Sequence, residues 1–564
     1  MSAAASPVNR GACVALLLTF SVGVAHAQHG APPGAPPPPQ DGSQFERRIQ
    51  PEPPIRAAPP TTPAAPPEAP TAPAISGRFI ISAIVIDGAT VFESSAFVPL
   101  YRDLLAKPVR QRDLAALAEA ITNMYYDAGY TLSRAYIPPQ DIEAGVIHVQ
   151  IAEGSIERVL IGGEAGTVEE LRRYTEPITA EQPLRRATLE RQLLLLSDLF
   201  GVRVDDARLR PIDAATGRYE LLLDIKTKPY DLYSYMDNRG TRANGPLELW
   251  TSAGMNVLNS GAWRAQAAFF TVPNTPQELL YGQASLAHVL GDQGTVLRGT
   301  LSASHSVAGA PENGNDALTS SRRLLVGITH PFMRSRQESL WAGFYFDALE
   351  SKEDEFKESF FDDQVRVIRP SVYYYIADGL KGENGINVEG SIGLSVLGAS
   401  TSGPERSRSD ASGSFRKAKL DVWRNQGLFG PWSLYGQFSG QISDRPLLAS
   451  EEFLLGGARF GRGYDPAIIS GDRGAAGSVE LRFTQPVQRV LREYQLYAFY
   501  DAGGISNGVV DGNSRHRLAS TGGGTRFTLQ PAIRLDLELA KPLDSVTGRE
   551  ARDWRGFFFL SAEF

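Results

Sequence analysis

From Lys228 to the end of the chain, apolar and polar residues alternate with a period of two in segment after segment. Such alternation places successive side chains on opposite faces of a β-strand. The segments are about ten residues long, the length that a tilted strand needs to cross a bilayer. The clearest one has Ile533, Leu535, Leu537 and Leu539 on one face, and Arg534, Asp536 and Glu538 on the other.

A barrel with lipid outside and water inside requires strands of this kind, apolar on one face and polar on the other. Residues 432–442 and 494–501 repeat the pattern. Counting from Tyr230–Asn238, we find sixteen candidate strands, the last being Phe557–Phe564. Sixteen strands enclose an aqueous lumen, and an even number returns the C-terminus to the side where the barrel begins. A soluble β-sandwich also alternates, so the pattern alone leaves both architectures open.

Ahead of the alternating region, residues 79–152 combine strands with helices. Residues 79–88 read as a buried strand that ends at Asp87-Gly88. Two further strands are predicted near 132–136 and 146–152. Between residue 88 and these two strands lies a helix with Asp113 as the expected N-cap and Gly129 as the stop. Its apolar residues are Leu114, Leu117, Ala118, Ile121, Met124, Tyr125 and Ala128.

Residues 155–227 repeat this order of elements. A strand is predicted at 156–161, a capping box at Thr167-Val168-Glu169-Glu170, and a closing hairpin from 203–212 and 218–226. The helix between them presents Leu189, Leu193, Leu196 and Phe200 on one face and ends at Gly201.

The first 27 residues have the form of a signal peptide. Arg10 precedes an apolar run from Ala12 to Ala25, and Ala25-His26-Ala27 is an A-x-A cleavage site. The alternative, an N-terminal membrane anchor, needs about 20 apolar residues, and this run is shorter. The only cysteine, Cys13, lies inside the signal peptide, so the mature chain is expected to lack thiol chemistry and disulfides.

Residues 28–76 are dominated by proline and alanine, a composition typical of an extended linker. Residues 43–50 interrupt it with a stretch long enough for two helical turns. So short a helix is marginal on its own, so both a helix and an unordered linker remain open.

Composition and charge exclude several classes of function. The formal net charge is −7, which argues against a nucleic-acid partner. The seven histidines do not show ligand spacing, apart from His26 and His29 beside the cleavage site, so no metal site is predicted. The glycine-rich stretch 455–463 lacks the Gly-Lys-Ser/Thr ending of a phosphate loop, and we predict neither a cofactor nor an enzyme.

A long loop precedes the strand that contains Glu480. It carries Arg462-Gly463-Tyr464 among many apolar residues, and loops of this length are usually functional or disordered. The tripeptide resembles the arginine-glycine-aromatic motif on the sixth extracellular loop of two-partner-secretion transporters, the haemolysin secretion/activation protein family. That family usually has valine where Gly461 stands here.

Residues 79–154 resemble the POTRA domain of the same family. Short motifs fall at matching separations: Gly129-Tyr130, Ile137-Pro138-Pro139-Gln140, Gly145-Val146 and Glu153-Gly154. We therefore expect a mainly β protein in which two periplasmic POTRA domains of α+β structure precede a 16-stranded antiparallel transmembrane β-barrel. The expected boundaries are 77–154 for the first POTRA domain, 155–227 for the second and 228–564 for the barrel. In the family a short upstream helix often plugs the pore, the role implied for residues 43–50.

The resemblance also implies a site. Phe499-Tyr500-Asp501 resembles the F-x-D motif on the thirteenth strand, which is also the thirteenth strand of our count. Arginine always carries its charge and needs an acceptor inside a barrel. We predict that Arg462 reaches Asp501, with Glu480 as a second acceptor; the alternative is an exposed loop in which Arg462 pairs with nothing. The final strand ends in Phe564, which resembles the signal by which outer-membrane barrels are recognised for assembly.

The predicted function is export of an unfolded exoprotein across the bacterial outer membrane. The POTRA domains would recognise this partner, similar to a haemagglutinin, haemolysin or adhesin, in the periplasm. Outer-membrane lipid, periplasmic chaperones and the barrel-assembly machinery are further expected partners. The main alternative is an insertase that assembles other barrels, against which two POTRA domains count because bacterial prototypes carry more. A passive porin and a soluble glycan-binding β-protein are weaker alternatives.

Overall fold

The computed structural model describes residues 79–140, 142, 145–163, 169–241, 245–258, 261–307, 317–355, 358–487, 491–507, 515–529, 532–545 and 553–564. The predicted signal peptide (1–27), the proline-rich linker (28–76) and its possible helix (43–50) lie outside the described residues. The first two residues of the predicted capping box, Thr167 and Val168, lie outside them as well.

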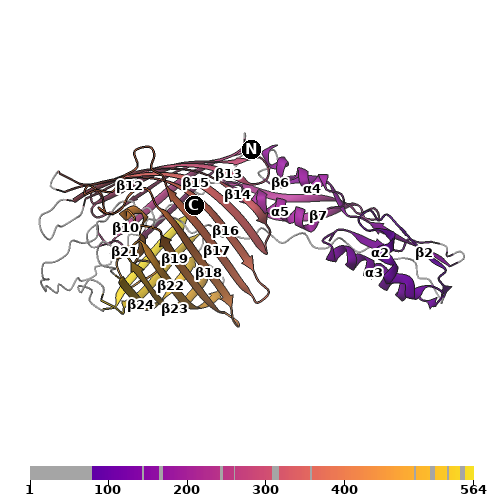
Figure 1. The fold of residues 1–564 in the computed structure, drawn as a ribbon. Coiled ribbons are helices and arrows are strands. Elements are labelled where there is room, and N and C mark those ends of the chain that lie inside the picture. Colours follow the sequence, from indigo (N-terminus) through magenta and orange to yellow (C-terminus); the bar gives the residue numbers. More distant parts are fainter. Residues whose placement is uncertain are drawn as a thin grey trace, which may run out of the picture. The chain divides into compact units, whose positions relative to one another are not determined.

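The first unit is a three-stranded sheet with two helices, ordered β2-β5-β4 (Figure 1). β2 is parallel to β5, and β4 is antiparallel to β5. Helix α3 buries Leu114, Leu117, Ile121 and Tyr125, the face that the helical spacing predicts. Its elements are β1 (Phe79–Ile80), β2 (Ala83–Asp87), α2 (Ser94–Tyr101), η1 (Arg102–Leu104), β3 (Pro108–Val109), α3 (Gln111–Asp127), β4 (Arg134–Tyr136) and β5 (Val146–Ala152).

The prediction of Asp113 as the N-cap of α3 is wrong by three residues. Arg110 is the N-cap, and the Asp113 carboxylate, in the first turn, accepts a hydrogen bond from the Arg110 backbone N–H at 2.8 Å. A carboxylate there still satisfies a free donor and favours the positive end of the helix dipole. Gly129 follows the helix with φ +90°, a conformation that glycine adopts without strain.

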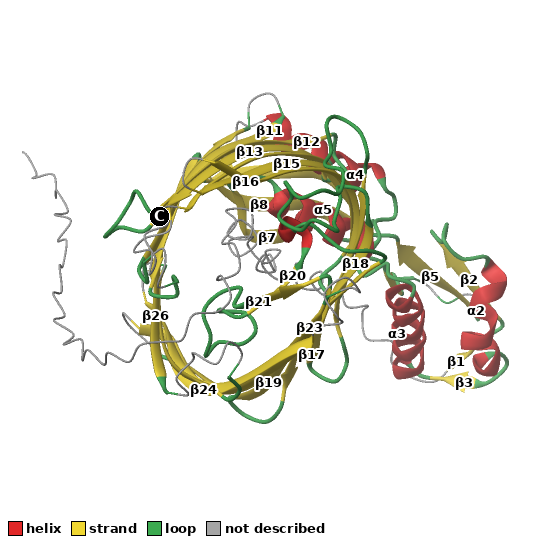
Figure 2. Ribbon diagram, turned by 60° about the vertical axis from the view of Figure 1, so that its left-hand side comes forward, coloured by secondary structure: helices red, strands yellow, loops and turns green. Residues whose placement is uncertain are grey.

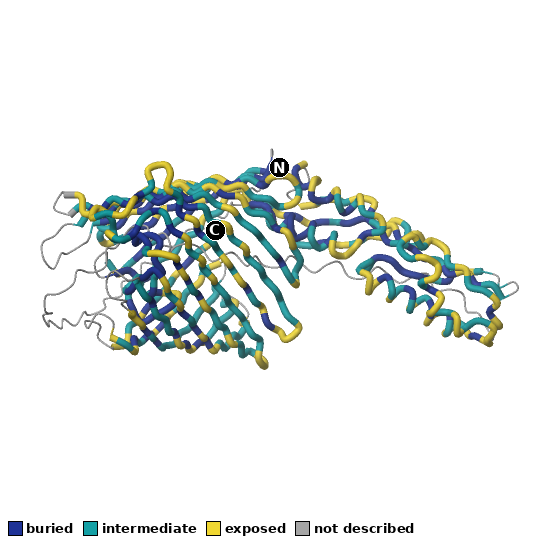
Figure 3. The backbone as a smooth tube through the Cα atoms, viewed as in Figure 1, coloured by how far each residue is buried: buried dark blue, intermediate teal, exposed yellow. Residues whose placement is uncertain are grey.

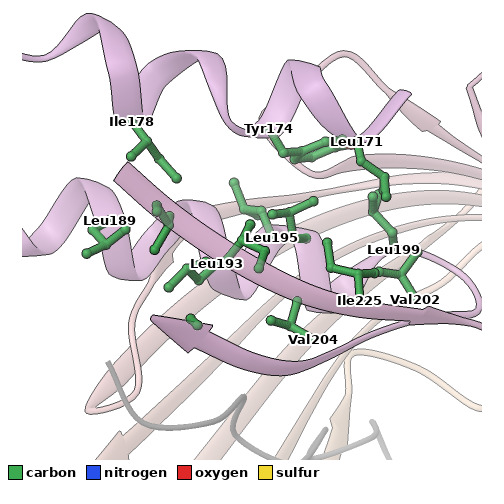
Figure 4. Packing of buried hydrophobic residues seen from close by; sticks show 14 of the residues in the cluster. Leu171, Tyr174, Ile178, Leu189, Leu193, Leu195, Leu199, Val202, Val204 and Ile225 are labelled. Carbon is green, nitrogen blue, oxygen red and sulfur yellow. The ribbon is translucent and has the colours of Figure 1, made fainter. Parts of the chain in front are cut away.

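The second unit has the same topology, with the sheet order β6-β8-β7. β6 is parallel to β8 and β7 is antiparallel to β8, as in the first unit. Figure 4 shows its core, in which Leu189, Leu193 and Leu195 of α5 pack with Leu171, Tyr174 and Ile178. α5 ends at Asp198, so Phe200 is buried beyond the helix and not on its face. The elements are β6 (Ser155–Gly163), η2 (Glu169–Tyr174), α4 (Glu176–Ala180), α5 (Arg186–Asp198), β7 (Val202–Asp213) and β8 (Arg218–Thr227).

The remaining described chain forms a closed antiparallel barrel of sixteen strands (Figures 1 and 2). The predicted strand count is therefore confirmed, and Asp501 lies on the thirteenth strand, β23. The barrel strands are β9 (Tyr230–Asp237), β10 (Glu248–Val257), β11 (Ala262–Thr271), β12 (Leu279–Leu290), β13 (Thr295–Val307), β14 (Ala317–Arg334), β15 (Glu338–Glu355), β16 (Glu358–Ala377), β17 (Gly382–Gly393), β18 (Arg416–Gly427), β19 (Trp432–Ser443), β22 (Arg473–Pro486), β23 (Leu491–Ser506), β24 (Arg515–Leu529), β25 (Ile533–Pro542) and β26 (Arg555–Glu563).

Burial alternates along many of the barrel strands, as the sequence pattern predicts (Figure 3). On β25, Leu537 and Leu539 are 46% and 58% exposed, whereas Glu538 between them is 7% exposed. Apolar side chains thus cover the outer face and polar ones line the lumen, the arrangement that a lipid-exposed barrel requires.

The seam between the first and last strands closes the barrel. β26 pairs with β9 from Phe559↔Asp237 to Glu563↔Tyr233. Phe564 continues the pairing, because its backbone N–H and C=O bond the C=O and N–H of Leu232 at 2.8 and 3.1 Å. The Phe564 residue remains 61% exposed. The C-terminal residue therefore extends the seam by its backbone and leaves its ring on the surface.

Candidate functional site

The chain between β19 and β22 folds into the barrel and does not project from it. It contains η3 (Ala449–Glu451) and the short antiparallel pair β20 (Phe453–Leu455) and β21 (Ile469–Gly471). In Figure 2, β20 and β21 lie within the ring of barrel strands. We call residues 444–472 the lumenal loop. Its buried side chains Phe453, Leu455, Phe460, Tyr464 and Ile469 form one cluster with Ala476, Ile505 and Leu518 of the wall.

Glycines allow the tip of this loop, residues 456–468, to turn sharply. Gly456, Gly457 and Gly461 all have positive φ. At Gly461, with φ +78°, an added Cβ would also lie 2.6 Å from Cδ1 of Leu518. The glycine that replaces the family's valine is therefore required by this backbone.

Arg462 extends from the tip into a buried acidic pocket of the wall. Its Nη2 and Nε lie 2.7 and 3.0 Å from the Asp501 carboxylate oxygens, and its backbone N–H donates to Asp501 Oδ2 at 3.1 Å. Its Nη1 lies 2.5 Å from Oε1 of Glu480. Arg462 is 3% exposed and Asp501 0%. A planar guanidinium can serve two carboxylates at once, which a single ammonium does less well.

Three further groups complete the pocket. The Arg462 guanidinium carbon lies 3.5 Å from the centre of the Phe499 ring, a cation–π contact. Nη2 donates to Ser478 Oγ at 2.8 Å, and Nη1 lies 3.6 Å from a Glu538 oxygen. The groups that contact Arg462 come from three strands, β22, β23 and β25.

The two main acceptors differ in their other partners. Glu480 is also paired with Arg526 at 3.1 Å and Arg482 at 2.6 Å. Within the described residues, Arg462 is the single cation paired with Asp501, which otherwise accepts from Ser520 Oγ at 3.2 Å. Removal of Arg462 would therefore leave Asp501 without a cation, whereas Glu480 would keep two.

Gly463 and Tyr464 fix the tip against the last strands. A Cβ at Gly463 would lie 2.6 Å from the backbone nitrogen of Pro542, so glycine permits this close approach. The Tyr464 hydroxyl lies 2.9 Å from Ala519 O and 2.8 Å from Asp544 O, and it accepts from the Asp544 N–H at 2.9 Å.

The structure thus brings together Arg462, Asp501, Glu480 and Phe499, the residues that the sequence singles out. Sequence reasoning missed Ser478 and Glu538. Their inward positions follow from the alternation of β22 and β25, but their approach to one arginine depends on strand register, which the pattern does not supply.

No group of three or more His, Cys, Asp or Glu among the described residues is placed to hold a metal ion. The helices that the structure describes include none long and apolar enough to cross a membrane.

Comparison with known proteins identifies the family. Residues 79–154 match the model of the ShlB-type POTRA domain, and residues 380–527 match that of the haemolysin secretion/activation proteins ShlB/FhaC/HecB. The heme/hemopexin transporter protein HuxB of Haemophilus influenzae is 22% identical over 473 residues, covering 79% of this chain and 80% of HuxB. The outer membrane transporter CdiB of Dickeya dadantii is 23% identical over 450 residues, covering 71% and 72%.

Solved structures have the same fold. CdiB from Escherichia coli aligns over 90% of this chain and 94% of its own with a TM-score of 0.72 and 19% identity. CdiB from Acinetobacter baumannii aligns over 93% and 96% with a TM-score of 0.61 and 16% identity. The barrel lies in the outer membrane, with the N-terminal POTRA units in the periplasm. In its POTRA region and in part of its barrel, the chain thus matches the haemolysin secretion/activation protein family, the outer-membrane transporters of two-partner secretion.

Proposed function

We propose that this transporter captures an unfolded exoprotein with two POTRA domains, residues 77–154 and 155–227, and passes it through the lumen past the lumenal loop. The client would be an adhesin-, haemagglutinin- or haemolysin-like chain that folds at the cell surface. The observation that carries the proposal is the buried Arg462 pocket, because a loop held inside the lumen by specific charge pairs must move before a polypeptide can pass.

Capture in the periplasm is proposed to use backbone pairing at the edge of a POTRA sheet. An edge strand presents free N–H and C=O groups to which an extended segment can add as a further strand. In the first unit the edges are β2 and β4. The side chains of Arg134 and Tyr136, on β4, bond the carbonyls of Ala214 and Ala215 in the second unit at 2.6 and 3.1 Å. β2 is therefore the more accessible edge for a client.

The lumenal loop is proposed to act as a latch. Its tip fills part of the lumen, and its apolar cluster and the Arg462 pocket hold it against β22 to β25. No ATP is present in the periplasm, so the drive would come from folding of the client outside. The matched family model describes secretion proteins, so the comparisons do not favour the insertase alternative. The matched relatives are named as transporters and not as enzymes.

The test is co-expression with the product of the neighbouring gene, which we expect to be a large secreted β-protein. We expect that protein to appear outside the cell only when the transporter is present. Deleting residues 79–154 or 155–227 should stop export while the barrel still inserts. Export that continues without either unit would contradict POTRA recognition, and export without the transporter would contradict the proposed function as a whole.

A further inference from the structure

The lumenal loop has a second buried attachment, at its base, that involves none of the Arg462 pocket. Glu451, in η3, places Oε1 2.5 Å from Nη2 of Arg369 on β16 and Oε2 2.6 Å from Nζ of Lys417 on β18. The Glu451 backbone oxygen accepts from Lys417 Nζ at 2.9 Å and from Gln441 Nε2 at 3.0 Å. The Glu451 side chain is 3% exposed.

The wall is built to hold this carboxylate. Nε of Arg369 lies 3.0 Å from Asp347, which is paired in turn with Arg323 at 2.7 Å. Nη1 of Arg369 donates to Ser391 Oγ at 2.7 Å. These wall residues come from β14 to β17 and orient the Arg369 guanidinium through contacts that do not involve the lumenal loop.

A neighbouring connection, residues 394–415, supports the base from the other side. Arg408 lies 2.9 Å from Glu452 and 2.7 Å from Asp472, which flank the Phe453↔Gly471 end of the antiparallel β20–β21 pair. Ser407 Oγ accepts from the Ala449 N–H at 3.0 Å. The packing around this base is apolar: Leu349, Val365, Val367, Ala411, Phe415, Leu447 and Leu448.

The two attachments differ in their position on the wall and in the sign of the charge that the loop contributes. The tip brings a cation, Arg462, to carboxylates on β22, β23 and β25, whereas the base brings an anion, Glu451, to cations on β16 and β18. They therefore use separate sectors of the wall. The opposite signs also prevent either end from occupying the other's pocket, because like charges would meet there.

We propose that Glu451 is a positioning residue that keeps the base of the lumenal loop on the wall when the tip is released, so that the latch opens by movement of the tip about a fixed base. This inference rests on the proposed role of the loop as a latch. Release of the tip then requires separation only from the Arg462 pocket, and the loop returns to the same register after each client.

The charges around the base give a specific test. Arg323, Arg369 and Lys417 face Asp347 and Glu389, the last 3.9 Å from Arg369, so without Glu451 this group of side chains would carry one more positive than negative charge. Glu451→Gln should therefore loosen the base. Adding Lys417→Met removes the excess charge, and a charge-balanced pocket is far less costly than one with an unpaired ion.

The experiment is hydrogen–deuterium exchange on the purified full-length transporter, read separately for the tip (456–468) and the base (447–455). We expect Arg462→Ala to accelerate exchange at the tip by roughly tenfold or more while the base changes by less than about twofold. Glu451→Gln should accelerate the base by roughly a hundredfold, the scale expected for a stranded buried charge. The matched control is Glu405→Gln, an exposed carboxylate on the neighbouring connection, which should change neither segment.

Rescue decides between positioning and general loss of stability. The double variant Glu451→Gln/Lys417→Met should recover most of the base protection that Glu451→Gln loses. Equal acceleration of tip and base in Arg462→Ala, or a protected base in Glu451→Gln, would overturn the proposal. If Glu451→Gln does not assemble, Lys417→Met alone must loosen the base and not the tip. A different result, normal export by Arg462→Ala, would contradict the proposed role of the loop as a latch.

Discussion

Replacement of Arg462 by alanine should nearly abolish export while the barrel still assembles. Arg462 is 3% exposed, and among the described residues it is the cation that pairs with Asp501, which is fully buried. Leaving a buried charge without its partner costs roughly 3–5 kcal/mol, whereas loss of a surface pair costs at most about 1 kcal/mol. A cost of the larger size is sufficient to release the tip from its pocket, so the latch would no longer hold a defined closed position.

The same contacts rank the variants. Asp501→Ala should be milder than Arg462→Ala, because Arg462 keeps Glu480 at 2.5 Å. The double variant should be no worse than Arg462→Ala, since coupled partners are not additive. Arg462→Lys should recover only part of the export, because an ammonium cannot reproduce the planar contacts to Asp501 and Glu480 together.

The assay is the amount of client outside the cell, normalised to heat-modifiable barrel in the outer membrane. Arg459→Ala is the matched control: Arg459 lies on the same tip, its side chain is 47% exposed, and among the described residues it forms one ion pair, to Asp421 at 2.8 Å. Its loss should change export little. Export by Arg462→Ala equal to that of Arg459→Ala would refute the role of the buried pocket, and additive effects of Arg462→Ala and Asp501→Ala would refute their coupling.

Three other predictions address the rest of the chain. Removal of Phe564 should lower the yield of assembled barrel, since its backbone closes the seam with Leu232, and normal assembly kinetics would count against this. Deletion of residues 28–76 should raise single-channel conductance in planar bilayers if a helix there fills the pore; unchanged conductance would mean a simple tether. Burial raises the pKa of Glu153, but hydrogen bonds from Thr90, Tyr125 and Val91 together lower the pKa by more than burial raises it. The pKa of Glu153 therefore lies below its ordinary 4.5. The stability that Glu153 gives the first POTRA domain should thus persist above about pH 4.5 and fall as the pH drops further, and exchange protection measured against pH should lose this dependence in Glu153→Gln.

The barrel could be predicted from the sequence because lipid and water impose a strict alternation on every spanning strand. The faces of β23 and β25, with Asp501 and Glu538 inward, follow from that rule alone. The partner of Arg462 could be predicted for a different reason. A charged residue in an otherwise apolar loop requires an acceptor, and the family resemblance indicated the strand that carries this acceptor.

The base of the lumenal loop could not be predicted in the same way. Glu451 lies in a segment without periodicity, and its partners Arg369 and Lys417 are 82 and 34 residues away on different strands. Whether three such side chains meet depends on the register and closure of the whole barrel, which no local pattern encodes. The predicted position of the helix N-cap, Asp113, was wrong for a local reason: a carboxylate can satisfy backbone N–H groups at a helix N-terminus from either the N-cap or the N3 position.

The most direct test of the central claim is to cross-link the lumenal loop to the barrel wall in its closed position. The sole cysteine of the chain, Cys13, lies in the predicted signal peptide, so the pair Arg459→Cys/Asp421→Cys can join the tip to β18 with a reducible bifunctional thiol reagent. Each single cysteine variant, treated alike, is the control. We expect cross-linked cells to stop exporting the client, and reduction of the link to restore export. Undiminished export through a cross-linked barrel would contradict passage of the client past the lumenal loop.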